Sequence, residues 1–279
     1  MHLFLIIVLI QRRITTIDLA RKEDTKLLSK IISDDVYQNV YMYIDTIVYG
    51  FNNDFIKTFV IRNDEGIEGI LFHYYDSLQI FICEEVNDND LNDIASHIKK
   101  YDFSMITGNN FVIKRIYDRL NDIYSITDGV IMKYDNETVV NSNRSTLAGI
   151  GDYEEIAKLI CSDDGIGGHY SVDSLCEQLK EGNLNQNCKS LIIRENGKII
   201  CHMATYAESP RLAVLGGLIT DVNYRGLGYG RMVLNDMTRV VQSENKIPVL
   251  YCYDKNVIDW YSRLGWEIVS TSSKLEKIN

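Results

Sequence analysis

The sequence contains little proline, and it has fewer basic than acidic residues. Only Pro210 and Pro248 occur among 279 residues, so no proline-rich linker divides the chain. The formal net charge is -10 and the sequence pI is near 5.0. Proteins that bind duplex nucleic acid carry a basic patch or stripe, so this balance argues against that class and weakly favours a cationic small substrate. With 46% hydrophobic and 24% charged residues, the composition is that of a globular chain with a core.

Metal-ligand and disulfide patterns are also missing. The six cysteines form no C-x-x-C pair and have no histidines at the spacing of a zinc site. The sequence therefore predicts no metal and no disulfide framework. Reduced thiols in a cytoplasmic protein are the simplest interpretation of the cysteines.

Apolar runs long enough to cross a bilayer, which takes about 20 residues, are absent too. The opening run from Leu3 to Ile10 is far shorter, and Arg12 and Arg13 follow it, whereas a signal peptide carries its positive charge in front. We expect a buried strand here and no membrane association, with a targeting segment as the open alternative.

The same order of elements occurs twice along the chain. Each half begins with a β-prone run followed by an amphipathic helix. Two strands joined by a polar turn containing glycine come next, and a short helix with an aromatic residue and an Arg-Leu pair follows. The matching pairs of segments are 14–35 with 145–164, 59–72 with 191–203, and 116–122 with 260–266. Three weak matches in one order indicate an internal duplication.

The polar segment from 134 to 145 is where the two halves should join. We place the domains at residues 1–138 and 139–279. The order of strands and helices predicts an α+β fold, in which each half is a mixed, mostly antiparallel twisted sheet flanked by helices.

The stretch "NYRGLGYGRMV" contains Gly226, Gly228 and Gly230 between a predicted strand over 211–222 and a predicted helix that follows. In this arrangement the free N–H groups at a helix N-terminus can bind an anion, and side chains would block its approach. The spacing is neither that of a Walker A loop nor that of a dinucleotide-binding fingerprint. Taken alone, the glycines could equally serve an ordinary tight turn.

Arg225 to Gly230 satisfies the [RQ]-x-x-G-x-[GA] signature, and in this respect the chain resembles the GCN5-related N-acetyltransferase (GNAT) family. The segment 254–267 is similar to that family's next motif, a strand end followed by a helix with a tyrosine and x-x-x-Gly-[Phe/Trp]. The resemblance covers residues 145–274. It implies two GNAT-like domains in tandem, of which 139–279 is catalytic. The first half has an acidic stretch without glycine at 87–98, so we expect it to be a degenerate GNAT-like domain, with an unrelated α+β domain as the alternative.

The resemblance also implies which residues bind acetyl-CoA, the expected cosubstrate. The pyrophosphate would lie on backbone amides after the strand, and the pantetheine arm along the strand end. Where the family motif usually has Asn, this chain has Asp254, and Asn256 two positions later is the nearest equivalent. The expected cofactor-binding residues are Ile219, Thr220, Val222, Arg225, Gly226, Leu227, Gly228, Tyr229, Gly230, Arg231 and Asn256.

Tyr261 matches the family's helix tyrosine and is the expected acid that returns a proton to the departing thiolate. It also falls on an apolar stripe, so a packing role stays open. Glu208, at the end of a strand beside the cofactor strand, is the first candidate for the base, with Asp221 second and a water chain or an ordinary loop carboxylate as alternatives. His169 and Tyr170 lie where this family often builds its acceptor wall.

The resemblance implies an acetyl-CoA-dependent N-acetyltransferase that acts on a small-molecule amine by direct attack of the amine on the thioester. A non-catalytic CoA-binding or interaction module and a protein N-acetyltransferase are the alternatives. Neither the acceptor nor the oligomeric state is encoded in a recognisable motif.

Overall fold

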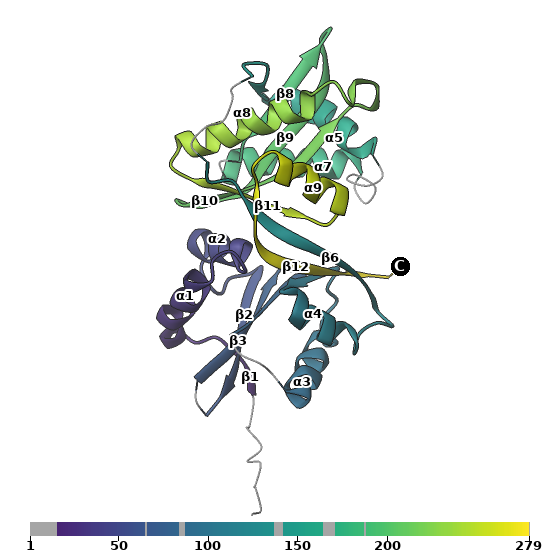
Figure 1. The fold of residues 1–279 in the computed structure, drawn as a ribbon. Helices are drawn as coiled ribbons and strands as arrows, with labels where there is room; N and C mark the ends of the chain where they lie inside the picture. The colour runs from purple at the N-terminus through teal and green to yellow at the C-terminus, as the bar shows by residue number, and fades with distance from the viewer. Residues whose placement is uncertain are drawn as a thin grey trace, which may run out of the picture. The chain divides into compact units, whose positions relative to one another are not determined.

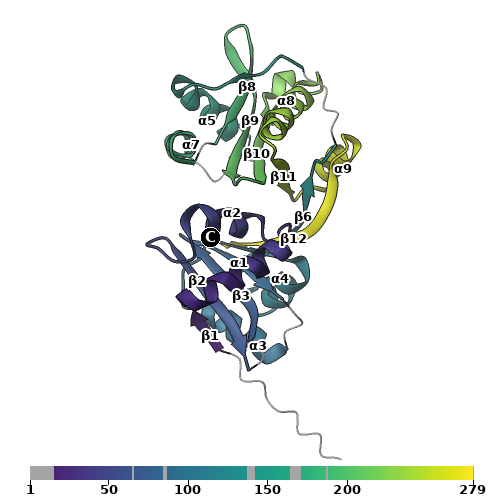
Figure 2. The same ribbon diagram turned by 90° about the vertical axis from the view of Figure 1, so that its left-hand side faces the viewer.

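The computed structural model describes residues 16–64, 66–83, 87–136, 142–163, 171–186 and 188–278. The chain forms two compact units (Figures 1 and 2). The first contains 1–31, 51–126 and 274–279, and the second contains 32–50 and 127–273. The predicted boundary after 138 and the predicted strand at 3–10 lie outside the described residues. The second unit therefore includes a segment, 32–50, that the sequence places in the first half.

The first unit is built on a sheet whose strands follow the order β1-β2-β3-β4-β5. Strands β1 to β4 pair antiparallel, and β5 is parallel to β4. Helices α3 and α4 cover one face, because their apolar side chains pack with those of β3 and β4 in a single buried cluster. The elements are β1 (Thr16–Leu19), the short 3-10 helix η1 (Lys22–Asp24), α1 (Thr25–Asp34), β2 (Ile56–Asn63), β3 (Gly66–Tyr74), β4 (Ser77–Ile82), α3 (Asp88–Ile98), β5 (Met105–Gly108) and α4 (Asn110–Tyr117).

The second unit has the strand order β6-β11-β10-β9-β8-β7. All neighbours are antiparallel except β10 and β11, which are parallel. Its elements are α2 (Val40–Tyr49), β6 (Tyr124–Lys133), β7 (Thr146–Leu147), η2 (Ile150–Asp152), α5 (Tyr153–Cys161), α7 (Val172–Gln186), β8 (Ser190–Glu195), β9 (Lys198–Glu208), β10 (Leu212–Thr220), η3 (Val222–Tyr224), α8 (Tyr229–Ser243), β11 (Ile247–Cys252) and α9 (Lys255–Arg263). Strands β6 and β12 (Glu267–Lys277) each contain residues of both units.

The alternation of side chains along β10 decides which helix covers which face of this sheet. Leu215 packs in the cluster that contains Val233 and Met237 of α8, whereas Val214 packs with Ile44 of α2 on the other face. Helices α5 and α7 lie on the same face as α2, and Figure 2 shows them on the side of β8 and β9 opposite to α8. The loop between β10 and α8 follows the C-terminal end of β10, which lies between β9 and β11 in the sheet.

Most of the predicted elements are present with nearby bounds. The turn between β8 and β9 has Asn196 at φ 51° and Gly197 at φ 81°, the left-handed conformations that the Asn-Gly pair predicts. Strand β11 ends at Cys252, and the Asp254 side chain then accepts hydrogen bonds from the N–H groups of Asn256 and Val257 in the first turn of α9. The predicted α+β class, with mixed, mostly antiparallel sheets, is confirmed. None of the described helices is both long and apolar enough to span a membrane.

Candidate active site

The loop between β10 and α8 has an open backbone. Gly226 and Gly228 have φ values of 78° and 88°, in the left-handed region that favours glycine. A Cβ atom on Gly226 would meet nothing within 4 Å, and one on Gly228 would meet only Met232 Cε, at 3.9 Å. The glycines are therefore required by the turn, and the space in front of them is empty of side chains.

Helix α8 begins at this loop without a side-chain cap. Gly228 is the N-cap, and the Met232 N–H donates to its carbonyl at 3.1 Å. The N–H groups of Tyr229, Gly230 and Arg231 precede that first intrahelical bond and have no acceptor within the helix. With the positive end of the helix dipole, they form a site suited to an anion.

The other residues expected at this loop surround the same opening. Val222 and Leu227 are 70% and 64% exposed. The Arg225 guanidinium donates to the Thr220 carbonyl at 3.0 Å and to Asp163 at 2.6 Å, so it ties the loop to the end of β10 and to the end of α5. These contacts hold the loop in one shape before any ligand binds.

The corresponding strand-to-helix position in the first unit has the opposite chemistry. The Asn87 side chain caps α3 by accepting from the N–H groups of Asn89 at 2.8 Å and Asp90 at 3.1 Å. Asp88 also lies there, and hydrogen bonds from Arg119 and Arg115 hold the pKa of its carboxyl below its usual range. Within residues 87–90, the helix start therefore presents carboxylates instead of open N–H groups.

A bulge interrupts β10 between its two ends. The pairing register with β9 shifts between Gly216 and Ile219, and Gly217 has a φ of 62°. A Cβ on either Gly216 or Gly217 would come within 2.5 Å of the Tyr206 side chain. Pairing with β11 stops at Val214, so the remainder of β10 adjoins no other described strand on that side.

His202 holds this bulge from within the sheet. Its Nδ1 lies 3.0 Å from the Gly217 carbonyl oxygen and must donate to it. The Nε2 atom, 3.3 Å from the Ser190 hydroxyl oxygen, is then left to accept from that hydroxyl. Burial lowers the pKa of His202 to about 4, so the ring is neutral at pH 7. The sequence analysis did not single out His202, because a histidine within an apolar strand has no distinctive motif.

Helix α2 adds a buried carboxylate to the face of the sheet on which Tyr206 lies. Asp45 is 8% exposed, and burial raises its pKa to about 7. One turn earlier, the Tyr41 ring stacks on Tyr251 with centroids 5.2 Å apart. Burial raises the pKa of Tyr41, and the charges of Tyr206 and Asp45 raise it further. Sequence reasoning missed this group, although one aspartate inside the apolar helix "VYMYIDTIVY" was an available signal.

Tyr261 lies on α9 and is 6% exposed. Its ring makes edge contacts with Trp260 and Trp266, at centroid distances of 4.9 and 5.6 Å, and burial raises its pKa. The phenol is therefore protonated at neutral pH. This placement fits both the catalytic role and the packing role that the sequence left open.

Glu208 lies at the end of β9 and pairs in register with Ala213, at the opposite end of β10 from the glycine loop. The intervening stretch of β10, up to Thr220, spans about 23 Å. Its carboxylate accepts hydrogen bonds from Lys189 at 3.0 and 3.1 Å, from Thr205 at 2.6 Å and from Lys246. Its expected role as the base stays a prediction, and these contacts give the residue a structural role that competes with it.

The remaining candidates are placed as follows. The Asp221 carboxylate accepts from Lys198 at 2.6 Å and from the Asn223 N–H at 3.0 Å, and the Lys198 hydrogen bond holds its pKa low. Asn256 is exposed in the first turn of α9. His169 and Tyr170 lie outside the described residues. Among the residues that are described, no group of three or more His, Cys, Asp or Glu side chains could hold a metal ion.

Comparison with known proteins gives a family for part of the chain and a fold for all of it. Residues 154–266 match the model of the acetyltransferase (GNAT) family. A search of curated proteins found no match.

Three solved structures illustrate the likeness of fold. A Drosophila protein has a TM-score of 0.70 at 12% identity, over 96% of this chain and 99% of its own. A GNAT acetyltransferase from Colwellia psychrerythraea has a TM-score of 0.57 at 14% identity, over 95% and 100%. A tandem GNAT protein from the clavulanic acid biosynthesis pathway has a TM-score of 0.53 at 10% identity, over 95% and 98%. The full-length likeness confirms the expected tandem GNAT architecture.

Proposed function

Because residues 154–266 match the model of the acetyltransferase (GNAT) family, we propose that the second unit transfers an acetyl group from acetyl-CoA to the amino group of a small molecule. The observation that carries this proposal is the uncapped start of α8 behind Gly226 and Gly228, where open N–H groups meet an empty space. A family match without that opening would leave the cosubstrate without a binding site.

The residues present fit acetyl-CoA. The N–H groups of Tyr229, Gly230 and Arg231 would bind the pyrophosphate, since this geometry suits an anion. The end of β10, from Gly217 to Thr220, adjoins no described strand on the β11 side, so the pantetheine amides can add to its backbone. When bound there, acetyl-CoA supplies the thioester whose acyl group is transferred.

Asp45 is the residue that we propose as the base. An attacking amine must first lose a proton, and a base is most effective when its pKa is near the working pH. The pKa of Asp45, about 7, meets that condition, and Asp45 lies on α2, which packs on β10. Glu208 is the competing candidate, but its carboxylate is already bound to two lysines.

Tyr261 is proposed as the acid that returns a proton to the thiolate. Its raised pKa keeps the phenol protonated at neutral pH, so a proton is in place when the thiolate leaves. The proton balance then closes: the ammonium proton passes to Asp45, the C–N bond forms as the C–S bond breaks, the phenol proton passes to sulfur, and the second proton released by the nitrogen returns to the Tyr261 phenolate.

The side chains around Asp45 indicate the class of acceptor. Tyr41, Tyr206 and Tyr251 supply aromatic surface on the same face as a carboxylate that is charged above pH 7. A compact amine with an apolar or aromatic body fits this combination, because the ring faces attract cations and the carboxylate pairs with them.

Titration calorimetry of the full chain with acetyl-CoA tests the proposal, with Gly228→Glu and Gly228→Lys as a matched pair. Both variants strain the left-handed backbone equally, so only the charge differs. A carboxylate about 4 Å from a phosphate charge opposes binding by about 4 kcal/mol near a protein surface, or roughly a thousandfold. We expect the glutamate variant to lose binding and the lysine variant to keep much more of it. Unchanged binding by folded Gly228→Glu would remove the proposed site.

Acetyl transfer to a panel of amines is the second measurement. Tight binding of acetyl-CoA with no transfer to any amine in the panel would favour a non-catalytic CoA-binding module. Transfer only to peptide substrates would favour a protein N-acetyltransferase.

A further inference from the structure

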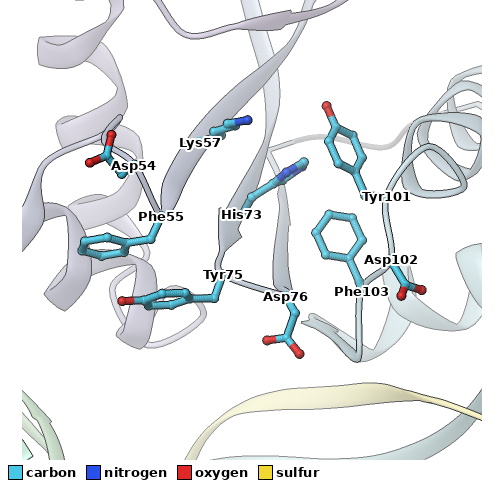
Figure 3. A pocket seen from close by; sticks show the side chains of 9 residues that line it. All are labelled: Asp54, Phe55, Lys57, His73, Tyr75, Asp76, Tyr101, Asp102 and Phe103. Carbon is cyan, nitrogen blue, oxygen red and sulfur yellow. The ribbon is translucent and has the colours of Figure 1, made fainter. Parts of the chain in front are cut away.

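The first unit contains a pocket that the proposed reaction does not use. Its volume is about 750 Å³, and it lies where β2 begins and β3 turns into β4. This is the end of β4 opposite to the start of α3, so the pocket does not correspond to the glycine loop of the second unit. Its lining comes from the start of β2, the turn between β3 and β4, and the segment between α3 and β5 (Figure 3).

Aromatic rings form two walls of this pocket. Phe55 and Tyr75 stack with centroids 4.9 Å apart and planes 10° apart, and Tyr101 and Phe103 lie 5.5 Å apart. Figure 3 shows the two pairs on either side of His73. The Tyr75 ring is 65% exposed although its backbone has a φ of 51°, a strained conformation for a tyrosine. The turn thus exposes a large aromatic ring at a position where glycine or asparagine would fit with less backbone strain.

The imidazole of His73, which lies between the two aromatic walls, carries no charge at neutral pH. His73 contacts Tyr101 and Phe103 at centroid distances of 4.7 and 4.8 Å, and its Nε2 lies 3.3 Å from that of His97. Burial lowers the pKa of His73 to about 3 and that of His97 to about 4. The His73 imidazole therefore adds flat neutral surface to the pocket and does not repel a cation.

Carboxylates outnumber cationic groups in the lining. Asp54, Asp76 and Asp102 contribute three, against the single ammonium of Lys57. Asp102 pairs with Lys277, whereas Asp54 and Asp76 form no ion pair with any described residue. An anionic ligand would meet a net negative site. A cation would meet both the carboxylates and the electron-rich ring faces.

We propose that this pocket binds an organic ammonium ion, held between the Phe55–Tyr75 pair and the Tyr101–Phe103 pair, with Asp54 and Asp76 supplying the opposite charge. The volume lies in the range of small-molecule sites, so it has room for the charged nitrogen and an attached organic body. The proposal does not depend on acetyl transfer, because all of these residues belong to the first unit.

The test is titration calorimetry of the full chain with choline and with benzyltrimethylammonium, beside the neutral isostere 3,3-dimethylbutan-1-ol. We expect both cations to bind and the isostere to bind at least tenfold more weakly, because it lacks the charge that the rings and carboxylates recognise. No binding of either cation would overturn the proposal. Equal binding of choline and the isostere would also overturn it, because the pocket would then be merely apolar.

Variants locate the binding in this pocket. Tyr75→Asn removes one ring while suiting the left-handed turn, so it should fold and weaken cation binding about tenfold. Asp76→Asn should weaken it about threefold, and Lys57→Met should strengthen it by a similar factor. Asp93→Asn, an exposed carboxylate on α3, is the matched control and should change nothing.

Cation binding that survives Tyr75→Asn and Asp76→Asn unchanged would place the site elsewhere and refute the assignment. Binding that persists in Gly228→Glu would show that it is independent of the acetyl-CoA site.

Discussion

Replacing Asp45 with asparagine should make the second unit more stable at neutral and alkaline pH. Asp45 is 8% exposed, and burial raises its pKa from 3.8 to about 7. Each unit of pKa shift corresponds to about 1.4 kcal/mol, so ionising this carboxyl in the folded chain costs about 4 kcal/mol. Asparagine has nearly the same shape and no charge, and does not incur that cost.

The sign of the effect follows from the direction of the shift. A carboxyl whose pKa is raised on folding holds its proton more tightly in the folded chain than in the unfolded one. Its stabilising contribution is complete below pH 3.8 and is lost as the pH rises through about 7. The free energy of unfolding of Asp45→Asn minus that of the parent should therefore grow by about 4 kcal/mol between pH 4 and pH 8, and then level off.

Urea denaturation of both proteins at several pH values measures this difference, with Glu208→Gln as the control. The Glu208 side chain is only 4% exposed and is paired with Lys189 and Lys246, so its replacement should destabilise the chain and not stabilise it. In parallel, the rate of acetyl transfer by the parent should rise with a midpoint near pH 7, and this rise should be absent from Asp45→Asn. A stability difference that does not change between pH 4 and pH 8 would refute the reasoning. An unaltered pH profile of the rate would reject Asp45 as the base.

Three further changes test the site and its surroundings. Tyr261→Phe should lower kcat about a hundredfold with little change in the KM for acetyl-CoA; an unchanged kcat would assign the ring to packing alone. His202→Leu should lower the free energy of unfolding by about 1–3 kcal/mol, because the Gly217 carbonyl loses its buried donor, and His202→Asn should restore part of it in the same denaturation assay. Asn87→Ala should cost about 1 kcal/mol of stability without affecting acetyl-CoA binding, since the cap of α3 lies in the other unit; a large loss of binding would contradict this separation.

The glycine loop could be predicted from the sequence because everything it needs is local. Gly226 and Gly228 adopt the left-handed conformation, and a strand precedes them and an amphipathic helix follows. Each of these features is encoded within a few positions of the sequence. The turn at Asn196 and Gly197 was predictable for the same reason. The contrast with the first unit was also local, because Asn87 and Asp90 follow β4 directly in the chain.

Local patterns by themselves thus determined the strands, the turns, the open helix start and the match to the GNAT family. The tertiary structure alone decided that the carboxylate of α2 is buried against the sheet that contains β10. Asp45 comes from a helix that precedes this strand by more than 150 residues in the chain, yet it packs on the same sheet. Glu208 had the more suggestive place in the sequence, but Lys189 and Lys246 approach it only in the folded unit. The pKa of a carboxyl depends on burial and on charges brought near by folding, and neither is encoded in the residues beside it.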